Sequence, residues 1–75
     1  MKYCILVYIG GGDIVAVQTD SVVDAPIKLG SGYDSVVRFE ADGEYVDASY
    51  VKDRASVSGG NVSFNGIVAT QVGAA

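Results

Sequence analysis

Branched aliphatic side chains dominate this sequence, and the residues that favour helices are scarce. The chain holds 13 Val and 5 Ile against 2 Leu, 2 Glu, 2 Gln and a single Met. Valine and isoleucine have a stiff χ1 torsion, and their branched side chains fit the half-buried surface of a sheet better than a helix. The composition therefore predicts an all-β fold.

The chain is short for a domain that must be stable by itself. Its 75 residues predict a single domain over residues 1–75. A domain of this size buries only about 60–65% of the surface that its unfolded chain exposes. A disulfide or a structural zinc is not expected, because Cys4 is the only cysteine and the chain has no histidine. Association with other chains is one expected source of extra stability, and a self-sufficient small barrel is the alternative.

Apolar runs separated by turn residues indicate about seven short strands. The expected strands cover residues 2–9, 14–19, 36–40, 45–51, 56–58, 61–64 and 67–72. Most of the turns between them are rich in glycine, at Gly10-Gly11-Gly12-Asp13, Asp42-Gly43, Gly59-Gly60 and Asn65-Gly66. Short strands joined by such hairpins predict a small antiparallel β-barrel or sandwich.

Two segments are harder to assign. Residues 22–29 contain Pro26, which cannot donate a ladder hydrogen bond, so we expect an extended segment at a sheet edge. Residues 44–55 fit a strand or a short helix, because Val46, Tyr50 and Arg54 fall four apart and Asp42 is a possible cap. We predict a strand over residues 45–51.

The first strand is apolar on both of its faces. One face carries Tyr3, Ile5, Val7 and Ile9, and the other carries Cys4, Leu6 and Tyr8. Antiparallel strands usually leave one face in water, so a strand without alternation is covered on both sides. The second cover comes either from another subunit or from a loop of the same chain over a strand in the middle of a barrel or sandwich.

The charge of the chain argues against two kinds of partner. The net charge is −4, and the five cationic residues are scattered along the sequence. A nucleic-acid binder needs a basic stripe, and an anionic membrane attracts basic clusters, so neither partner is expected. The apolar run of residues 3–9 ends in glycines and an aspartate, so we expect a strand of a mature protein made in the cytosol rather than a signal peptide.

The candidate residues for catalysis and metal binding have ordinary structural explanations. Cys4 has no histidine to activate it, and we expect a buried, unreactive thiol. The acidic residues Glu40, Asp42, Glu44 and Asp47 lack the spacing of a calcium loop. The glycine turns lack the Lys-Ser/Thr pair of a phosphate loop. We therefore predict no catalytic residue, no cofactor, no metal site and no enzymatic activity.

Five tyrosines are the candidates for protein contacts. They are Tyr3, Tyr8, Tyr33, Tyr45 and Tyr50. Tyrosine is enriched at interfaces because it buries a large area and keeps a polar hydroxyl group. We expect Tyr33, in a Gly/Ser loop, to be the most exposed of the five, although each ring can instead cap the core with its hydroxyl group in water.

In overall character the chain resembles the cement or decoration proteins of tailed-phage capsids. The resemblance lies in the Met1 start, the short acidic chain rich in Val, Gly, Asp and Ser, the scarcity of Lys and the lack of His and Trp. It implies a β-rich, homo-oligomeric module, with a trimer as one expected form, that binds the major capsid protein on the exterior of the virion. The alternative expectation is a stand-alone β-barrel that binds another protein as an adaptor or inhibitor.

Overall fold

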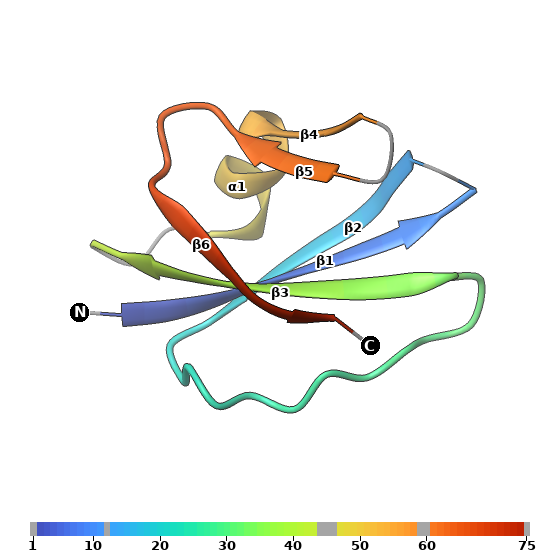
Figure 1. The fold of residues 1–75 in the computed structure, drawn as a ribbon, viewed down its shortest axis with the longest axis horizontal. Coiled ribbons are helices and arrows are strands. Elements are labelled where there is room, and N and C mark those ends of the chain that lie inside the picture. Colours follow the sequence, from blue (N-terminus) through green and yellow to red (C-terminus); the bar gives the residue numbers. More distant parts are fainter. Residues whose placement is uncertain (1, 12, 44–46, 59–60, 75) are drawn as a thin grey trace.

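The computed structural model describes residues 2–11, 13–43, 47–58 and 61–74. Within these residues the elements are β1 (Lys2–Gly10), β2 (Asp13–Asp20), β3 (Ser35–Asp42), α1 (Ala48–Arg54), β4 (Ala55–Ser58), β5 (Asn61–Phe64) and β6 (Ala69–Ala74), shown in Figure 1. The all-β prediction is confirmed, because strands predominate and α1 is short. No helix among these residues has the length and apolar character needed to cross a membrane.

The strands form two antiparallel sheets. The larger sheet has the order β2-β1-β3-β6, and the smaller sheet is the β4–β5 hairpin. Over the described residues β2 and β6 each have a strand on one side only, so the larger sheet remains open at both edges. The fold is therefore a small open β structure, and no closed ring of strands is formed by this part of the chain.

Strand β1 lies at the centre of the larger sheet. Val7 pairs with Val17 on β2 and with Val37 on β3, which places three valines side by side on one face. Every β1 side chain from Tyr3 to Val7 is buried, and so is Ile9. The run of apolar residues therefore folds into the middle of the protein, as a strand without alternation requires.

One face of the sheet packs against α1 and the small hairpin. The buried side chains of this core are Tyr3, Ile5, Val7, Ile9, Val17, Val37, Phe39, Ala41 and Val51. Phe39 of β3 meets Phe64 of β5 edge to face, with ring centroids 5.0 Å apart. Figure 1 shows α1, β4 and β5 together on this side of the sheet.

The other face of the sheet is covered by the loop between β2 and β3. Ala25 packs against Cys4 and Leu6, and Ile27 adds a partly buried side chain to the same cluster. The guanidinium Nη1 of Arg38 donates a hydrogen bond to the carbonyl of Ala25 at 3.0 Å. Figure 1 shows this loop running along the sheet on the side opposite to α1. The second cover of β1 thus comes from the same chain, and no other subunit is needed at this strand.

The predicted strand over residues 45–51 is wrong for the residues that the structure describes. These residues begin α1, and the carboxylate of Asp47 accepts a hydrogen bond from the Tyr50 amide at 2.8 Å. An aspartate at this position satisfies an amide that the helix leaves without a partner. Val51 then points into the core. Residues 45 and 46 lie outside the described part.

Three further expectations about the connections also fail. Residues 22–29 pair with no described strand, because they cross the sheet face as a loop. Asp42-Gly43 is followed by α1 rather than by a returning strand. Asn65-Gly66 does not close a hairpin, because β5 and β6 belong to different sheets. The antiparallel pairings of β1 with β2 and of β4 with β5 confirm the two other predicted hairpins.

Gly10 is a position where the fold requires the lack of a side chain. A Cβ atom there would lie 2.7 Å from the carbonyl oxygen of Gly32 and 3.1 Å from Cγ2 of Val15. We expect Gly10→Ala to lower the free energy of unfolding by about 1–3 kcal/mol, because the backbone near Gly32 must shift. Urea unfolding followed by circular dichroism measures this change.

Gly73→Ala is the matched control. The added Cβ would lie at an ordinary 3.8 Å from Ile27, and neither Gly10 nor Gly73 has a positive φ. Equal stability of the two variants would contradict the close approach of the loop to the end of β1.

Candidate functional site

Tyr8 and Tyr33 meet on the loop side of the sheet. The amide of Asp34 donates to the carbonyl of Ile9 at 2.8 Å, and the amide of Gly11 donates to Oδ2 of Asp34 at 2.8 Å. These hydrogen bonds fix the end of the loop against the β1–β2 turn. Tyr33 is thereby held on Tyr8, with ring centroids 5.0 Å apart and ring planes at 48°.

A groove lies between these two tyrosines and strand β2. It has a volume of ≈ 540 Å³ and is lined by Tyr8, Ala16, Val17, Gln18, Lys28, Leu29, Gly30 and Tyr33. We call this surface the tyrosine groove. Leu29 is 52% exposed, although it is a large apolar side chain. A groove of this size with aromatic and aliphatic walls and few polar groups suits a side chain or short segment of another molecule.

The tyrosine groove continues into a second hollow along the sheet. This hollow, of ≈ 180 Å³, shares Tyr8, Gln18 and Lys28 with the groove and extends to Asp20 and Pro26. The free edge of β2 runs beside both hollows. An extended segment of another protein would therefore find the open edge of β2 next to hollows with both apolar and polar walls, an arrangement that suits strand addition.

The outer side of β6 is a second open surface, which we call the β6 edge. The strand Ala69–Ala74 contains no charged residue, and on its other side it pairs with β3. Val68, directly before it, is 88% exposed, and Val72 within it is 39% exposed. Natural edge strands are usually protected by charges, proline or cover, so an uncharged edge with exposed valines is suited to contact.

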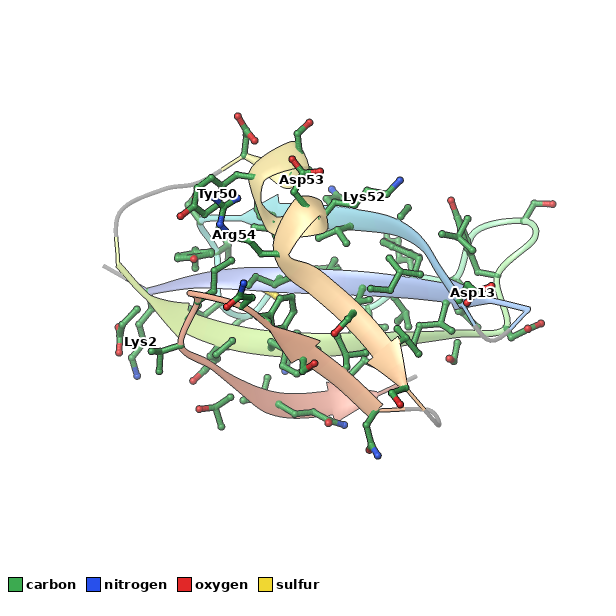
Figure 2. The ribbon with its side chains drawn as sticks, turned by 90° about the horizontal axis from the view of Figure 1, so that it is seen from above. Lys2, Asp13, Tyr50, Lys52, Asp53 and Arg54 are labelled. Atoms are coloured by element: carbon green, nitrogen blue, oxygen red, sulfur yellow. The ribbon has the colours of Figure 1, made fainter. Side chains whose placement is uncertain are left out.

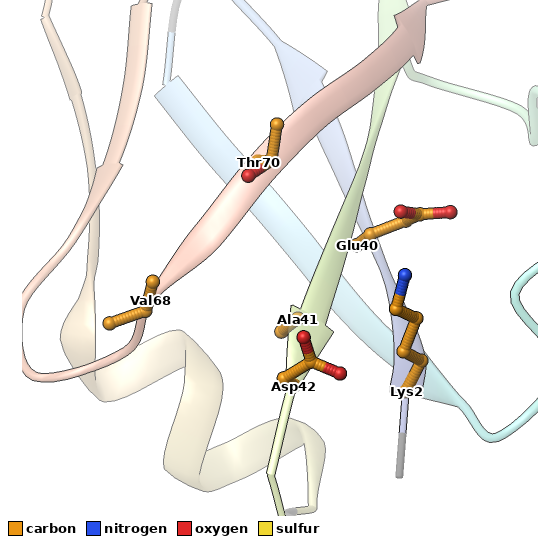
Figure 3. Close-up of a pocket in the computed structure, with 6 residues that line it drawn as sticks. All are labelled: Lys2, Glu40, Ala41, Asp42, Val68 and Thr70. Atoms are coloured by element: carbon orange, nitrogen blue, oxygen red, sulfur yellow. The ribbon is translucent and has the colours of Figure 1, made fainter.

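A small hollow lies at the beginning of β6. Its volume is ≈ 160 Å³, and it is lined by Lys2, Glu40, Ala41, Asp42, Val68 and Thr70. Figure 3 shows the side chain of Lys2 on the same side as Glu40, with Asp42 close by and Val68 and Thr70 across the hollow. The charged groups that line this hollow therefore belong to β1 and β3, while Thr70 of β6 and Val68 before it contribute uncharged side chains.

The same end of the molecule holds Tyr50 and Arg54 on α1. The guanidinium of Arg54 lies 3.7 Å from the centroid of the Tyr50 ring, and its Nη1 donates to the Tyr50 carbonyl at 3.2 Å. Figure 2 shows Tyr50 and Arg54 together at the end of the molecule that carries Lys2, with Asp13 at the opposite end. One face of the Tyr50 ring is therefore covered by Arg54 of its own helix, while the residue remains 40% exposed.

The five tyrosines occupy different environments. Tyr3 is 3% exposed and lies in the core, and Tyr50 stacks with Arg54. Tyr8 and Tyr33 are half-buried and come together in the tyrosine groove, so Tyr33 is less exposed than expected. Tyr45 lies outside the described residues. An interface role for these tyrosines stays a prediction.

Sequence reasoning missed Leu29 and the β6 edge. Leu29 stands next to a Gly/Ser loop, where an isolated apolar residue gives little signal. The uncharged run Ala69–Ala74 was readable as a strand, but only the sheet order places it at an edge. Sequence spacing alone does not reveal which strand lacks a neighbour.

Among the described residues, the candidates for catalysis or metal binding do not meet in one place. Cys4 is fully buried between the sheet and its loop. Asp47 caps α1, whereas Glu40 and Asp42 lie on β3, and Glu44 is outside the described residues. Over the described ranges, no three His, Cys, Asp or Glu side chains come together as metal ligands.

The tyrosine groove and the β6 edge lie at opposite edges of one sheet. The order β2-β1-β3-β6 places two strands between them, so a partner at one surface leaves the other accessible. The arrangement can hold two neighbours at once through apolar contacts and backbone hydrogen bonds. No family of known proteins, no curated protein and no solved structure matches this chain.

Burial also makes the fold sensitive to alkaline pH. Burial raises the pKa of the Tyr3 hydroxyl above 10.0, and Tyr50 raises it further. Burial likewise raises the pKa of the Cys4 thiol above 9.0, an effect that Arg38 partly opposes. Because the fold favours the neutral forms of both groups, their contribution to the free energy of unfolding is fully present below the ordinary pKa values. That contribution is lost as pH rises through the raised values.

We expect the free energy of unfolding to fall above about pH 9 in the wild type and to fall less in Tyr3→Phe. Urea unfolding across this pH range measures the effect. Tyr50→Phe is the matched control and should change the slope less, because burial affects Tyr3 more than Tyr50 does. Identical alkaline losses in the wild type and Tyr3→Phe would contradict this assignment.

Proposed function

We propose that this chain is a non-enzymatic structural protein that bridges neighbouring protein subunits, as the cement proteins of tailed-phage capsids do. In this proposal it acts on the exterior of a virion, and the major capsid protein and copies of itself are its partners. The observation that supports the proposal is the position of two contact surfaces, the tyrosine groove and the β6 edge, at opposite edges of one sheet.

A bridging protein needs two surfaces that can be occupied at the same time. The tyrosine groove opens beside β2, and β6 is the far strand of the same sheet, so the partners would not overlap. The sheet between them is held together by the buried core around β1 and by the pairing of its four strands. A sheet with a contact surface at each of its two edges suits the reinforcement of a shell.

Each contact need not be strong by itself. The tyrosine groove is a single hollow of ≈ 540 Å³ and the β6 edge is one six-residue strand, whereas the interfaces of stable pairs bury about 1,600 Å² in total. Many copies on a regular lattice gain strength from multivalency, because each bound copy places the next contact at a high effective concentration. The net charge of −4 would also oppose nonspecific association of unbound copies in solution.

The test uses empty shells, assembled without this chain, of the virus whose genome carries its gene. We expect the purified protein to cosediment saturably with these shells and to raise their temperature of thermal disruption. Leu29→Asp places a charge in the apolar tyrosine groove and should weaken binding at least about tenfold.

Ser49→Asp is the matched control, because it adds the same charge at an exposed position on α1, on the other side of the sheet. This variant should bind shells as the wild type does. A wild-type protein that leaves the shells unbound and equally heat-labile would overturn the proposal, and so would a gene that belongs to no virus.

A stand-alone binding module is the second candidate. The observation that favours it is the volume of the tyrosine groove, ≈ 540 Å³, beside the free edge of β2. An extended peptide could pair with β2 and place an apolar side chain against Leu29 and Tyr33. A soluble one-to-one complex that Tyr33→Ala abolishes, with no binding to shells, would favour this function over the first.

A further inference from the structure

We propose that the β6 edge takes β6 of a second copy of this chain, in antiparallel pairing about a two-fold axis. This inference rests on the proposed function for the idea that the chain acts by contact, and it names the partner at one of the two surfaces. The result would be one continuous eight-stranded sheet shared by two chains, built from the observed order β2-β1-β3-β6 in each.

The backbone of β6 supplies the attraction. In an antiparallel strand successive residues direct their amide and carbonyl groups alternately to the two sides, and β3 pairs with one side only. The groups on the other side are open to another strand. A second β6 has the same length and the same spacing of groups, so the two edges are complementary by symmetry.

Charge selects this edge for self-association. The chain has a net charge of −4, so two copies repel each other at most orientations. The strand Ala69–Ala74 has no charged residue, and two copies of it can pair without bringing like charges together.

The opposite edge of the sheet, at β2, carries charged residues that disfavour self-association. Strand β2 begins at Asp13 and ends at Asp20, so full antiparallel pairing of two β2 strands would place Asp13 of each copy opposite Asp20 of the other. Like charges directly opposite each other destabilise paired strands.

The pairing also has a consequence for function. The tyrosine groove of each copy lies beside β2, at the outer ends of the shared sheet. A β6-paired dimer would therefore present two identical grooves that face away from the contact. Such a dimer is a symmetric bridge, and each groove can bind one neighbouring subunit.

The contact should be weak. Six residues of strand extend about 20 Å, and the register of β6 against β3 shifts between Arg38 and Phe39, which marks an irregularity in this edge. Edge pairing of this length without a large side-chain interface gives association in the micromolar range rather than a permanent dimer.

Sedimentation equilibrium of the purified full chain across the micromolar range tests the inference. We expect a reversible transition from a species of 7.7 kDa to one of twice that mass. Hydrogen exchange measured at low and at high protein concentration should show added protection at the amides of β6 and none at those of β2.

Val72→Lys and Thr70→Lys place charge on the β6 edge, and each should weaken the dimer at least about tenfold. Val15→Lys is the matched control at the other edge, because Val15 is 42% exposed and Val72 is 39% exposed. Circular dichroism and thermal unfolding confirm that each variant is folded, and the use of two β6 variants keeps the test valid if one of them is unstable.

A wild type that stays monomeric overturns the inference, as does a trimer, because two-fold pairing closes with two chains. Loss of the dimer in Val15→Lys but not in the β6 variants also overturns it. Shell binding by a monomer that is sensitive to Leu29→Asp would then leave the proposed function standing. A dimer that depends on β6 but binds no shell would support the inference and refute the proposed function.

Discussion

The burial of β1 on both faces is the constraint on which this structure depends. Strand β1 pairs with β2 and β3 and is covered by α1 and the small hairpin on one side and by the β2–β3 loop on the other. A strand enclosed in this way loses its contacts with water, so its apolar side chains contribute the largest hydrophobic stabilisation in the chain. The other elements are positioned by their need to cover it.

The chain covers both faces of β1 by itself. The surfaces with which it can contact other proteins therefore lie away from this strand. Most apolar side chains on the two faces of the sheet are buried, and the groups left open among the described residues include the backbone edges of β2 and β6 and the side chains that line the tyrosine groove. Edges and grooves bind neighbours through short, local contacts. This distribution suits a protein that uses several modest interfaces better than one that depends on a single extensive interface.

The strands were predictable where local chemistry agreed with tertiary packing. Branched residues and glycine turns indicated β1, β2 and the β4–β5 hairpin, and all three occur. The helix was only the alternative for residues 44–55, because Val46 and Tyr50 also fit a strand, and its cap is Asp47 rather than Asp42. Of the candidate site, the position of Tyr33 in a loop was visible in the sequence, whereas its stacking on Tyr8 and the exposure of Leu29 depend on how that loop returns to β1.

The sequence by itself determined the fold class and the two-faced burial of its first strand, because these follow from residue type and alternation. Only the tertiary structure decided which segment covers β1, which strands lie at the edges and which tyrosines meet. Those properties depend on contacts between residues far apart in the chain. The loop from residue 21 to residue 34 shows the reason: its sequence is compatible with an edge strand, but the apolar face left open by Cys4 and Leu6 is better satisfied when Ala25 and Ile27 pack across it.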